Sequence, residues 1–195
     1  MHTFNSETRG AAPSSLAHTR ELAVGGMCLA LAVVVPILFH AVGGGLAGRT
    51  FLPMFLPILL LGLLTRPQVA VLGGVLAPFV SSLLTGMPPF LPTALLMAAE
   101  LGAMAGVASV LRQALRGNVW LAAVIAVATG RAVMALEAAL LGNVLLQLEL
   151  SWPVYVGATL VAGLPGTLLL VVLVPPLALA LERASRLGPM RGEAA

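Results

Sequence analysis

Long, nearly unbroken apolar runs are the feature that most constrains what this chain can fold into. Runs of about 20 apolar residues, the length of an α-helix that crosses a ~30 Å hydrocarbon layer, recur from residue 21 to residue 187. Only 9% of the residues are charged and the mean hydropathy is +1.06, whereas soluble domains carry about 25% charged residues. The runs lack the residue-by-residue alternation of a transmembrane barrel. The sequence therefore predicts an all-α polytopic membrane protein.

The runs predict a bundle of six transmembrane helices within residues 21–187, without a separate soluble domain. We place the spans at Glu21–Phe39, Phe51–Leu64, Gln68–Leu84, Pro92–Leu111, Val119–Leu141 and Trp152–Val174. The second run reaches only about 21 Å, so we expect it to be broken or only partly spanning, and buried in protein or lining a cavity. Pro175-Pro176 is expected to end the last span and leave Leu177–Leu187 at the interface. Residues 1–20 are predicted to be a disordered tail and residues 188–195 a C-terminal tail.

The arginines predict the orientation of the bundle. With six spans, a single arginine, Arg49, falls on one side, and eight fall on the other: Arg9, Arg20, Arg66, Arg112, Arg116, Arg183, Arg186 and Arg191. Because cytoplasmic loops are enriched in Lys and Arg, this bias predicts that both termini are cytoplasmic in a cell membrane. The same distribution explains a pI near 10.5 without nucleic acid as a partner.

Two ionisable residues lie deep inside predicted spans. Glu100 is eight residues from the outer end of its span, about 12 Å deep. Arg131 is twelve residues from the inner end of the next span, which leaves it also about 12 Å below the outer surface. A lipid-facing charge costs about 2.5–3.5 kcal/mol on insertion scales, so both should face the bundle interior. A ligand pocket is the preferred interpretation, and a packing salt bridge is the alternative.

Four further side chains are candidates for such a pocket. Met97 shares a helical face with Glu100, although methionines at this spacing also serve packing. Glu137 lies six residues after Arg131, near the outer boundary, and faces either the cavity mouth or water. Ser81 and Ser82 are polar residues near the end of the third span.

Two glycine-containing segments suggest movement and docking. The connection His40–Thr50 holds four glycines together with His40 and Arg49, so it is either a lid over the pocket or a flexible connector. In the first span, Gly26 and Ala30 form a small-xxx-small pair that permits close approach of another helix, within the chain or in a partner.

Enzyme and cofactor signatures are missing from the sequence. It contains no P-loop, no H-E-x-x-H and no G-x-S-x-G motif, and it has no aspartate. The single Cys28 excludes an intramolecular disulfide and a multi-cysteine metal site. We therefore expect no catalysis, no cofactor and no metal site, and any energy source must be a partner or an ion gradient.

Five blocks of the sequence resemble the substrate-binding S components of energy-coupling factor (ECF) vitamin transporters. They are R-E-L-A at Arg20–Ala23, F-L-P-M-F-L-P-I-L-L at Phe51–Leu60, G-x-x-A-P-x-x-S-S-L-L-T-G-M-P-P at Gly74–Pro89, M-A-A-E-L at Met97–Leu101 and G-R at Gly130–Arg131. The resemblance covers about Arg20 to Leu181, which is most of the chain.

The resemblance implies a six-helix bundle that captures a vitamin or vitamin precursor from outside. Such a subunit docks on a transmembrane T subunit and two ATPases and topples in the membrane to release its ligand. Docking in the family uses an A-x-x-x-A pair, for which this chain has Gly26 and Ala30. The closing loop of the family maps to His40–Thr50. Three alternatives stay open at this point: a self-sufficient secondary transporter of a small polar solute, a cobalt- or nickel-capturing subunit (suggested by Met1-His2), and a membrane scaffold.

Overall fold

The computed structural model describes residues 12–115, 118–141 and 151–187 of the chain. Within these ranges every regular element is a helix, which confirms the predicted all-α class. The elements are α1 (Ala12–Phe51), α2 (Phe55–Leu64), α3 (Pro67–Thr85), η1 (Phe90–Ala94), α4 (Leu95–Ala114), α5 (Val119–Leu141), α6 (Trp152–Ala162) and α7 (Leu164–Leu187).

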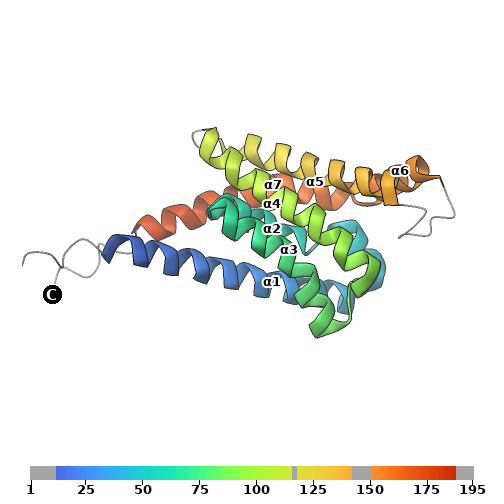
Figure 1. The fold of residues 1–195 in the computed structure, drawn as a ribbon, viewed down its shortest axis with the longest axis horizontal. Helices are drawn as coiled ribbons and strands as arrows, with labels where there is room; N and C mark the ends of the chain where they lie inside the picture. Colours follow the sequence, from blue (N-terminus) through green and yellow to red (C-terminus); the bar gives the residue numbers. More distant parts are fainter. Residues whose placement is uncertain (1–11, 116–117, 142–150, 188–195) are drawn as a thin grey trace, which may run out of the picture.

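Five helical segments of the described chain are long and apolar enough to cross a membrane. They are Thr19–Gly43, Pro67–Thr85, Phe90–Ala114, Val119–Leu141 and Leu164–Ala184. The long helices lie side by side, and the start of α1 and the end of α7 lie at the same end of the bundle (Figure 1). Large apolar side chains such as Leu72, Leu83 and Leu168 are exposed on the outside, as expected of surfaces that face lipid. The chain is therefore a multi-pass membrane protein.

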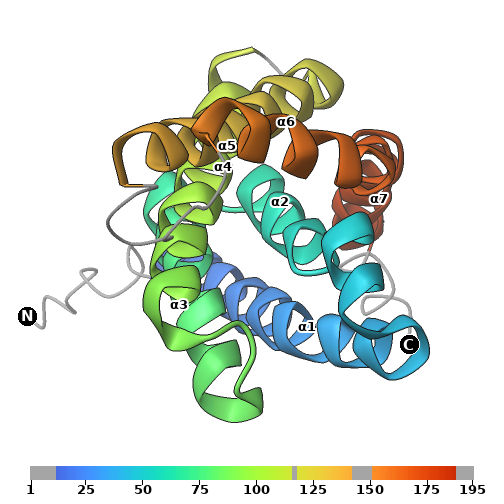
Figure 2. The ribbon, with the colours of Figure 1, turned by 90° about the vertical axis from the view of Figure 1, so that its right-hand side faces the viewer.

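The short helix α2 occupies the middle of the bundle, surrounded by α1, α3, α4, α5 and α7 (Figure 2). Its ten residues, FLPILLLGLL, are apolar on every side, and eight of them are buried. A helix that is hydrophobic all round belongs in such a position. The predicted burial of this short run in protein is thus confirmed, because a helix of about 15 Å meets other helices rather than lipid.

Helix α1 is longer than predicted at both ends. It begins at Ala12, inside the predicted tail, and it runs to Phe51. The prediction that His40–Thr50 is a loop was therefore wrong. Backbone groups in apolar surroundings must bond one another, and this need outweighs the cost of about 1 kcal/mol per glycine in a helix.

The C-terminal part of α1 is bent (Figure 2). A Cβ atom added to Gly48 would lie 2.9 Å from Cε1 of His40, although residues eight apart in a straight helix are separated by about 12 Å. The glycines between the two, which have no side chains to crowd, let the helix turn back on itself.

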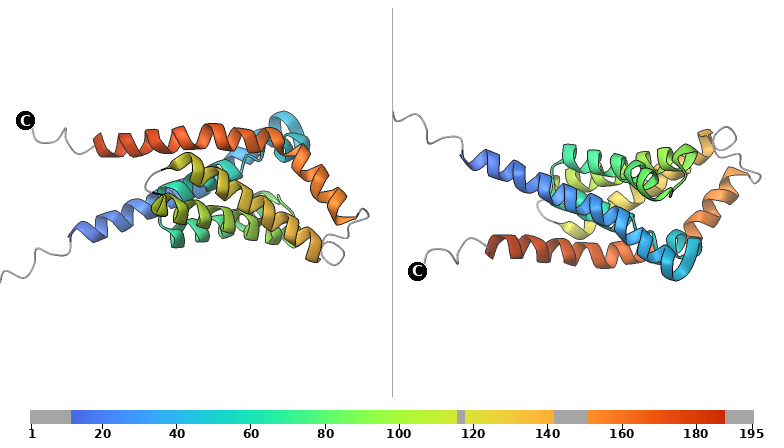
Figure 3. Two further views of the ribbon diagram at one scale, coloured as in Figure 1. Left: turned by 90° about the horizontal axis from the view of Figure 1, so that it is seen from above. Right: turned by 90° about the horizontal axis from the view of Figure 1, so that it is seen from below.

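The predicted sixth span, Trp152–Val174, is two helices. They meet at an angle at Gly163 (Figure 3). Pro165 cannot donate a backbone hydrogen bond and is tolerated in the first turn of α7. The predicted break at Pro175-Pro176 was wrong, because α7 continues through both prolines to Leu187. Pro175 is buried, and neighbouring helices allow a transmembrane helix to accept such residues.

Candidate ligand-binding site

Close packing of α4 against its neighbours fixes the position of Glu100. A Cβ atom on Gly74 of α3 would lie 2.7 Å from the carbonyl oxygen of Leu101, and one on Gly62 of α2 would lie 2.7 Å from that of Ala105. Real Cβ atoms do not approach a backbone this closely, so α4 meets α2 and α3 backbone to backbone. Glu100 lies directly beside the α3 contact and is 5% exposed.

The Gly130-Arg131 pair brings α5 to the same place. Gly130 is buried, and a Cβ atom there would lie 3.3 Å from Cβ of Met104 and 3.6 Å from Cγ of Glu100. The glycine therefore lets α5 approach α4 at the level of Glu100. The next residue, Arg131, is carried to the carboxylate by this approach.

Glu100 and Arg131 form a buried ion pair. Nη1 of Arg131 lies 3.0 Å from Oε1 of Glu100, and the side chains are 14% and 7% exposed. The structure thus places both side chains inside the bundle and in direct contact, at one level of α4 and α5.

Phe55, the first residue of α2, completes the surroundings of the arginine. Cζ of Arg131 lies 4.6 Å from the centroid of the Phe55 ring, within the range of a cation–π interaction. The sequence analysis missed Phe55, because no pattern distinguishes this phenylalanine from the other apolar residues of its run. The aromatic ring therefore fills part of the space around the guanidinium.

Two buried atoms of the pair have no hydrogen-bond partner among the described residues: Oε1 of Glu100 and Nη2 of Arg131. The 3.0 Å contact of Oε1 is an ion pair by distance, without the alignment of a hydrogen bond. Buried polar atoms are usually paired, and an unpaired one costs about 1–3 kcal/mol. An acceptor and a donor with spare capacity thus lie side by side in the bundle.

The other predicted pocket residues are distributed more widely. Met97 is partly buried and packs against the main apolar core. Glu137 is also partly buried, on α5. Ser81 is committed elsewhere, since its hydroxyl donates to the carbonyl oxygen of Met87 at 2.7 Å and holds the connection after α3. The neighbouring residue, Ser82, is also buried, with 8% of its surface exposed.

The predicted lid residues lie on the bent part of α1. Nδ1 of His40 donates to the carbonyl oxygen of Pro36 at 2.7 Å, and the ring packs against Gly48. The side chain of Arg49 lies outside what the structure describes. On the same helix, Gly26 and Ala30 are both exposed, and a Cβ atom on Gly26 would meet no atom within 4 Å.

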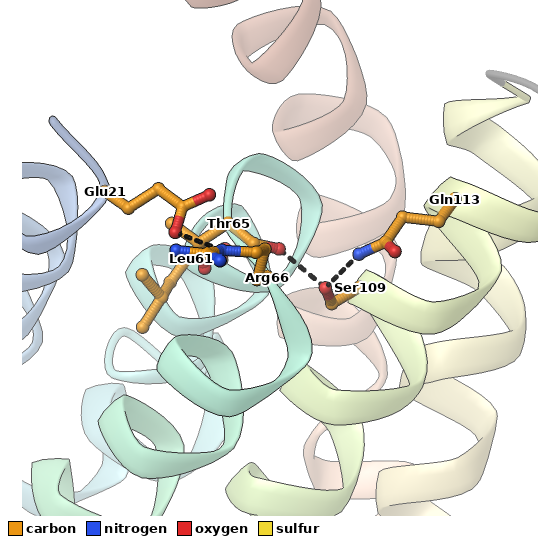
Figure 4. Close-up of polar contacts among 6 residues, drawn as sticks. All are labelled: Glu21, Leu61, Thr65, Arg66, Ser109 and Gln113. Atoms are coloured by element: carbon orange, nitrogen blue, oxygen red, sulfur yellow. Dashed lines mark hydrogen bonds and ion pairs between the residues drawn. The ribbon is translucent and has the colours of Figure 1, made fainter. Parts of the chain in front are cut away.

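A second set of polar contacts ties the helices at the end where α1 starts (Figure 4). Nε of Arg66 lies 2.6 Å from Oε2 of Glu21, and the hydroxyl of Ser109 donates to the carbonyl oxygen of Thr65 at 2.6 Å. Nearby, Arg112 donates to both carboxylate oxygens of Glu182 at 2.9 Å. These contacts fasten α1 and α4 to the α2–α3 turn and α7 to α4, and among the described residues Nε of Arg112 has no hydrogen-bond partner.

The grooves on the outside of the bundle do not include the ion pair. One, of about 490 Å³, runs between α3 and α4 and is lined by small and branched apolar residues such as Val71, Ala99 and Ala103. A neighbouring groove follows α3 alone, from Pro67 to Val75. Both lie on an apolar outer surface and lack Glu100 and Arg131.

Comparison with protein families decides what kind of bundle this is. The family described as "ECF transporter, substrate-specific component" matches residues 20–178. The chain belongs to this family. No curated protein and no solved structure matches the chain.

This S component is therefore a substrate-specific membrane subunit of a transporter, as the five sequence blocks indicated. The match includes α1 from its third turn, the whole ion-pair region and most of α7. Membership implies association with ECF T and ATPase modules. The secondary transporter and the scaffold are not supported by this assignment.

Proposed function

We propose that this S component captures a vitamin or vitamin precursor from outside the cell and delivers it through a T subunit and two ATPases. The single observation that supports this best is the Glu100–Arg131 pair, buried in the bundle with an unpartnered atom on each side chain. Ionisable groups inside membrane bundles usually mark substrate paths. Met97, one turn from Glu100, and Glu137, about 9 Å along α5 from Arg131, would extend the site. Ser81, Ser82, His40 and Arg49 are proposed only as parts of its outer closure.

We further propose six membrane crossings with both termini in the cytoplasm of a cell that carries the protein in its plasma membrane. Buried α2 would be the short crossing and α7 the last one. The ion pairs Arg66–Glu21 and Arg112–Glu182 support this orientation, because they gather arginines at the end where α1 starts and α7 ends. Arg9, Arg116 and Arg191 lie outside the described residues.

The exposed Gly26–Ala30 face is the proposed docking surface for the T subunit. Small exposed residues let a partner helix approach closely, and the open space at Gly26 leaves room for it. Gly26→Trp should abolish co-purification of the T subunit without loss of fold. Leu72→Trp is the matched control, because Leu72 is 59% exposed on α3, at a similar distance from the Arg66 end. Equal loss in both variants would contradict docking through α1.

Mass spectrometry of small molecules that co-purify with the protein tests ligand capture. The wild type should carry a stoichiometric small polar molecule, and Arg131→Ala should lose it while remaining folded in detergent. Arg66→Ala is the control, since it removes the same side-chain type from a site that is 46% exposed at the other end of the bundle. Undiminished retention by Arg131→Ala would refute the assignment of the site.

A further inference from the structure

We propose that the ligand group held by Glu100 and Arg131 is uncharged and presents a hydrogen-bond acceptor beside a donor, as an amide, a lactam or a ureide does. This inference rests on the proposed function and names the chemistry that the site selects. It excludes a carboxylate, an amine and a zwitterion as the contacted group.

The unpartnered atoms define the hydrogen bonds that the ligand must make. Nη2 of Arg131 is a pure donor and Oε1 of Glu100 is a pure acceptor. A ligand that satisfies both must accept from the guanidinium and donate to the carboxylate. Nη2 belongs to the same guanidinium as Nη1, and Nη1 lies 3.0 Å from Oε1 of Glu100. Nη2 and Oε1 are therefore close enough for one small planar group to bond both.

The position of Phe55 restricts the direction of approach. Its ring lies against the guanidinium with 4.6 Å between Cζ and the ring centroid. A ligand must reach the N–H groups, which point outward in one plane along the edge of the guanidinium. Amides and cyclic ureides carry their donor and acceptor in a plane, and they match this edge better than a tetrahedral ammonium group does.

The charge balance disfavours a charged ligand group. The ion pair is neutral as a whole. A ligand carboxylate is attracted by Arg131 but repelled by Glu100, and a ligand ammonium group is attracted by Glu100 but repelled by Arg131. Either group loses its hydration in a buried site and receives little net attraction in return. A zwitterion would have to break the 3.0 Å contact and desolvate two further charges.

Glu137 is the nearest other acid that the sequence places on α5, six residues beyond Arg131. This separation is about 9 Å along the helix, and the side chain is only partly buried. The negative charge of Glu137 adds to the repulsion of an anionic ligand group. The cationic probe in the test below measures its effect on cations.

The test uses purified full-length protein in lipid nanodiscs, freed of bound small molecules, and equilibrium dialysis with defined probes. Neutral probes are nicotinamide, riboflavin and biotin methyl ester. Charged probes are nicotinate, 3-(aminomethyl)pyridine and β-alanine. We expect saturable binding of at least one neutral probe and at least tenfold weaker binding of every charged probe. Binding confined to charged probes, or no saturable binding by any neutral probe, overturns the proposal.

Two variants separate hydrogen bonding from fold. Arg131→Lys keeps the charge beside Glu100 but loses the second nitrogen, so it should weaken the neutral probe at least tenfold, whereas Arg66→Lys should not. Glu100→Gln leaves a net positive site and should raise the affinity for nicotinate relative to nicotinamide at least tenfold. Unchanged ratios in both variants contradict the proposal.

The outcome for the ligand class is separable from the outcome for the proposed function. Tight binding of a charged probe would overturn the ligand class alone. Absence of any co-purifying molecule, together with failure to bind a T subunit, would overturn the function itself.

Discussion

Removing either member of the Glu100–Arg131 pair should destabilise the bundle, and removing both should restore much of the loss. At 3.0 Å and an effective dielectric constant of about 20, the attraction is about 5.5 kcal/mol before desolvation is subtracted. Desolvation offsets most of this gain, so the net value of the pair is small. Glu100→Leu or Arg131→Met, however, leaves one buried charge without its partner, at a cost of about 3–5 kcal/mol each. The double variant replaces both charges with apolar side chains and should be more stable than either single variant.

The free energy of unfolding in mixed SDS micelles, followed by circular dichroism, measures this cycle. A matched cycle on Glu21 and Arg66 supplies the control, since that pair is 23% and 46% exposed. Exposed pairs contribute about 0–1 kcal/mol, so the control variants should change stability little. A double variant at Glu100 and Arg131 whose loss equals the sum of the two single losses would refute the reasoning, because it would show that the charges are stabilised independently.

Four other substitutions, one of them a control, test how the helices are held around the site. Gly74→Ala should destabilise by more than about 2 kcal/mol in the same assay, because the new Cβ would lie 2.7 Å from an α4 carbonyl oxygen; Gly26→Ala, which meets nothing within 4 Å, should be close to neutral. Ser109→Ala should cost about 1–2 kcal/mol by leaving the buried carbonyl of Thr65 unpaired. Gly166→Ala should weaken retention of the co-purified molecule in native mass spectrometry, because its Cβ would lie 2.6 Å from the carbonyl carbon of Phe51 at the end of α1. No effect of Gly166→Ala would contradict the close contact between α7 and the end of α1.

The shared level of Glu100 and Arg131 along the bundle could be predicted from sequence, because it follows from counting residues along two consecutive helices. A helix rises 1.5 Å per residue, and the spans that contain Glu100 and Arg131 are bounded by clear turn signals, so both levels follow directly. The same signals set α5 at Val119–Leu141 as predicted and α3 within a residue of its predicted limits. The cost of a charge in lipid then predicts that both residues face inward.

The ends of α1 and α7 could not be predicted by these rules. Glycines and prolines mark loops in water because water satisfies the free backbone groups. In apolar surroundings the helix persists, as it does through His40–Thr50 and through Pro175-Pro176. The contact of Phe55 with Arg131 could not be predicted either, because it depends on how α2 packs in three dimensions rather than on a periodic pattern.

The position of Phe55 links the ion pair to the connection between α1 and α2. Phe55 follows the end of α1 by four residues. The connection includes Leu52 at φ 52°, a left-handed backbone conformation that residues other than glycine rarely adopt. The backbone at Phe51 lies against Gly166 of α7, with no room for a single added carbon. The end of α1 thus packs against α7, and the chain that follows it leads within four residues to Phe55, whose ring contacts Arg131. Because so few residues separate these contacts, we expect any shift of α1 away from α7 to displace Phe55 from Arg131 as well.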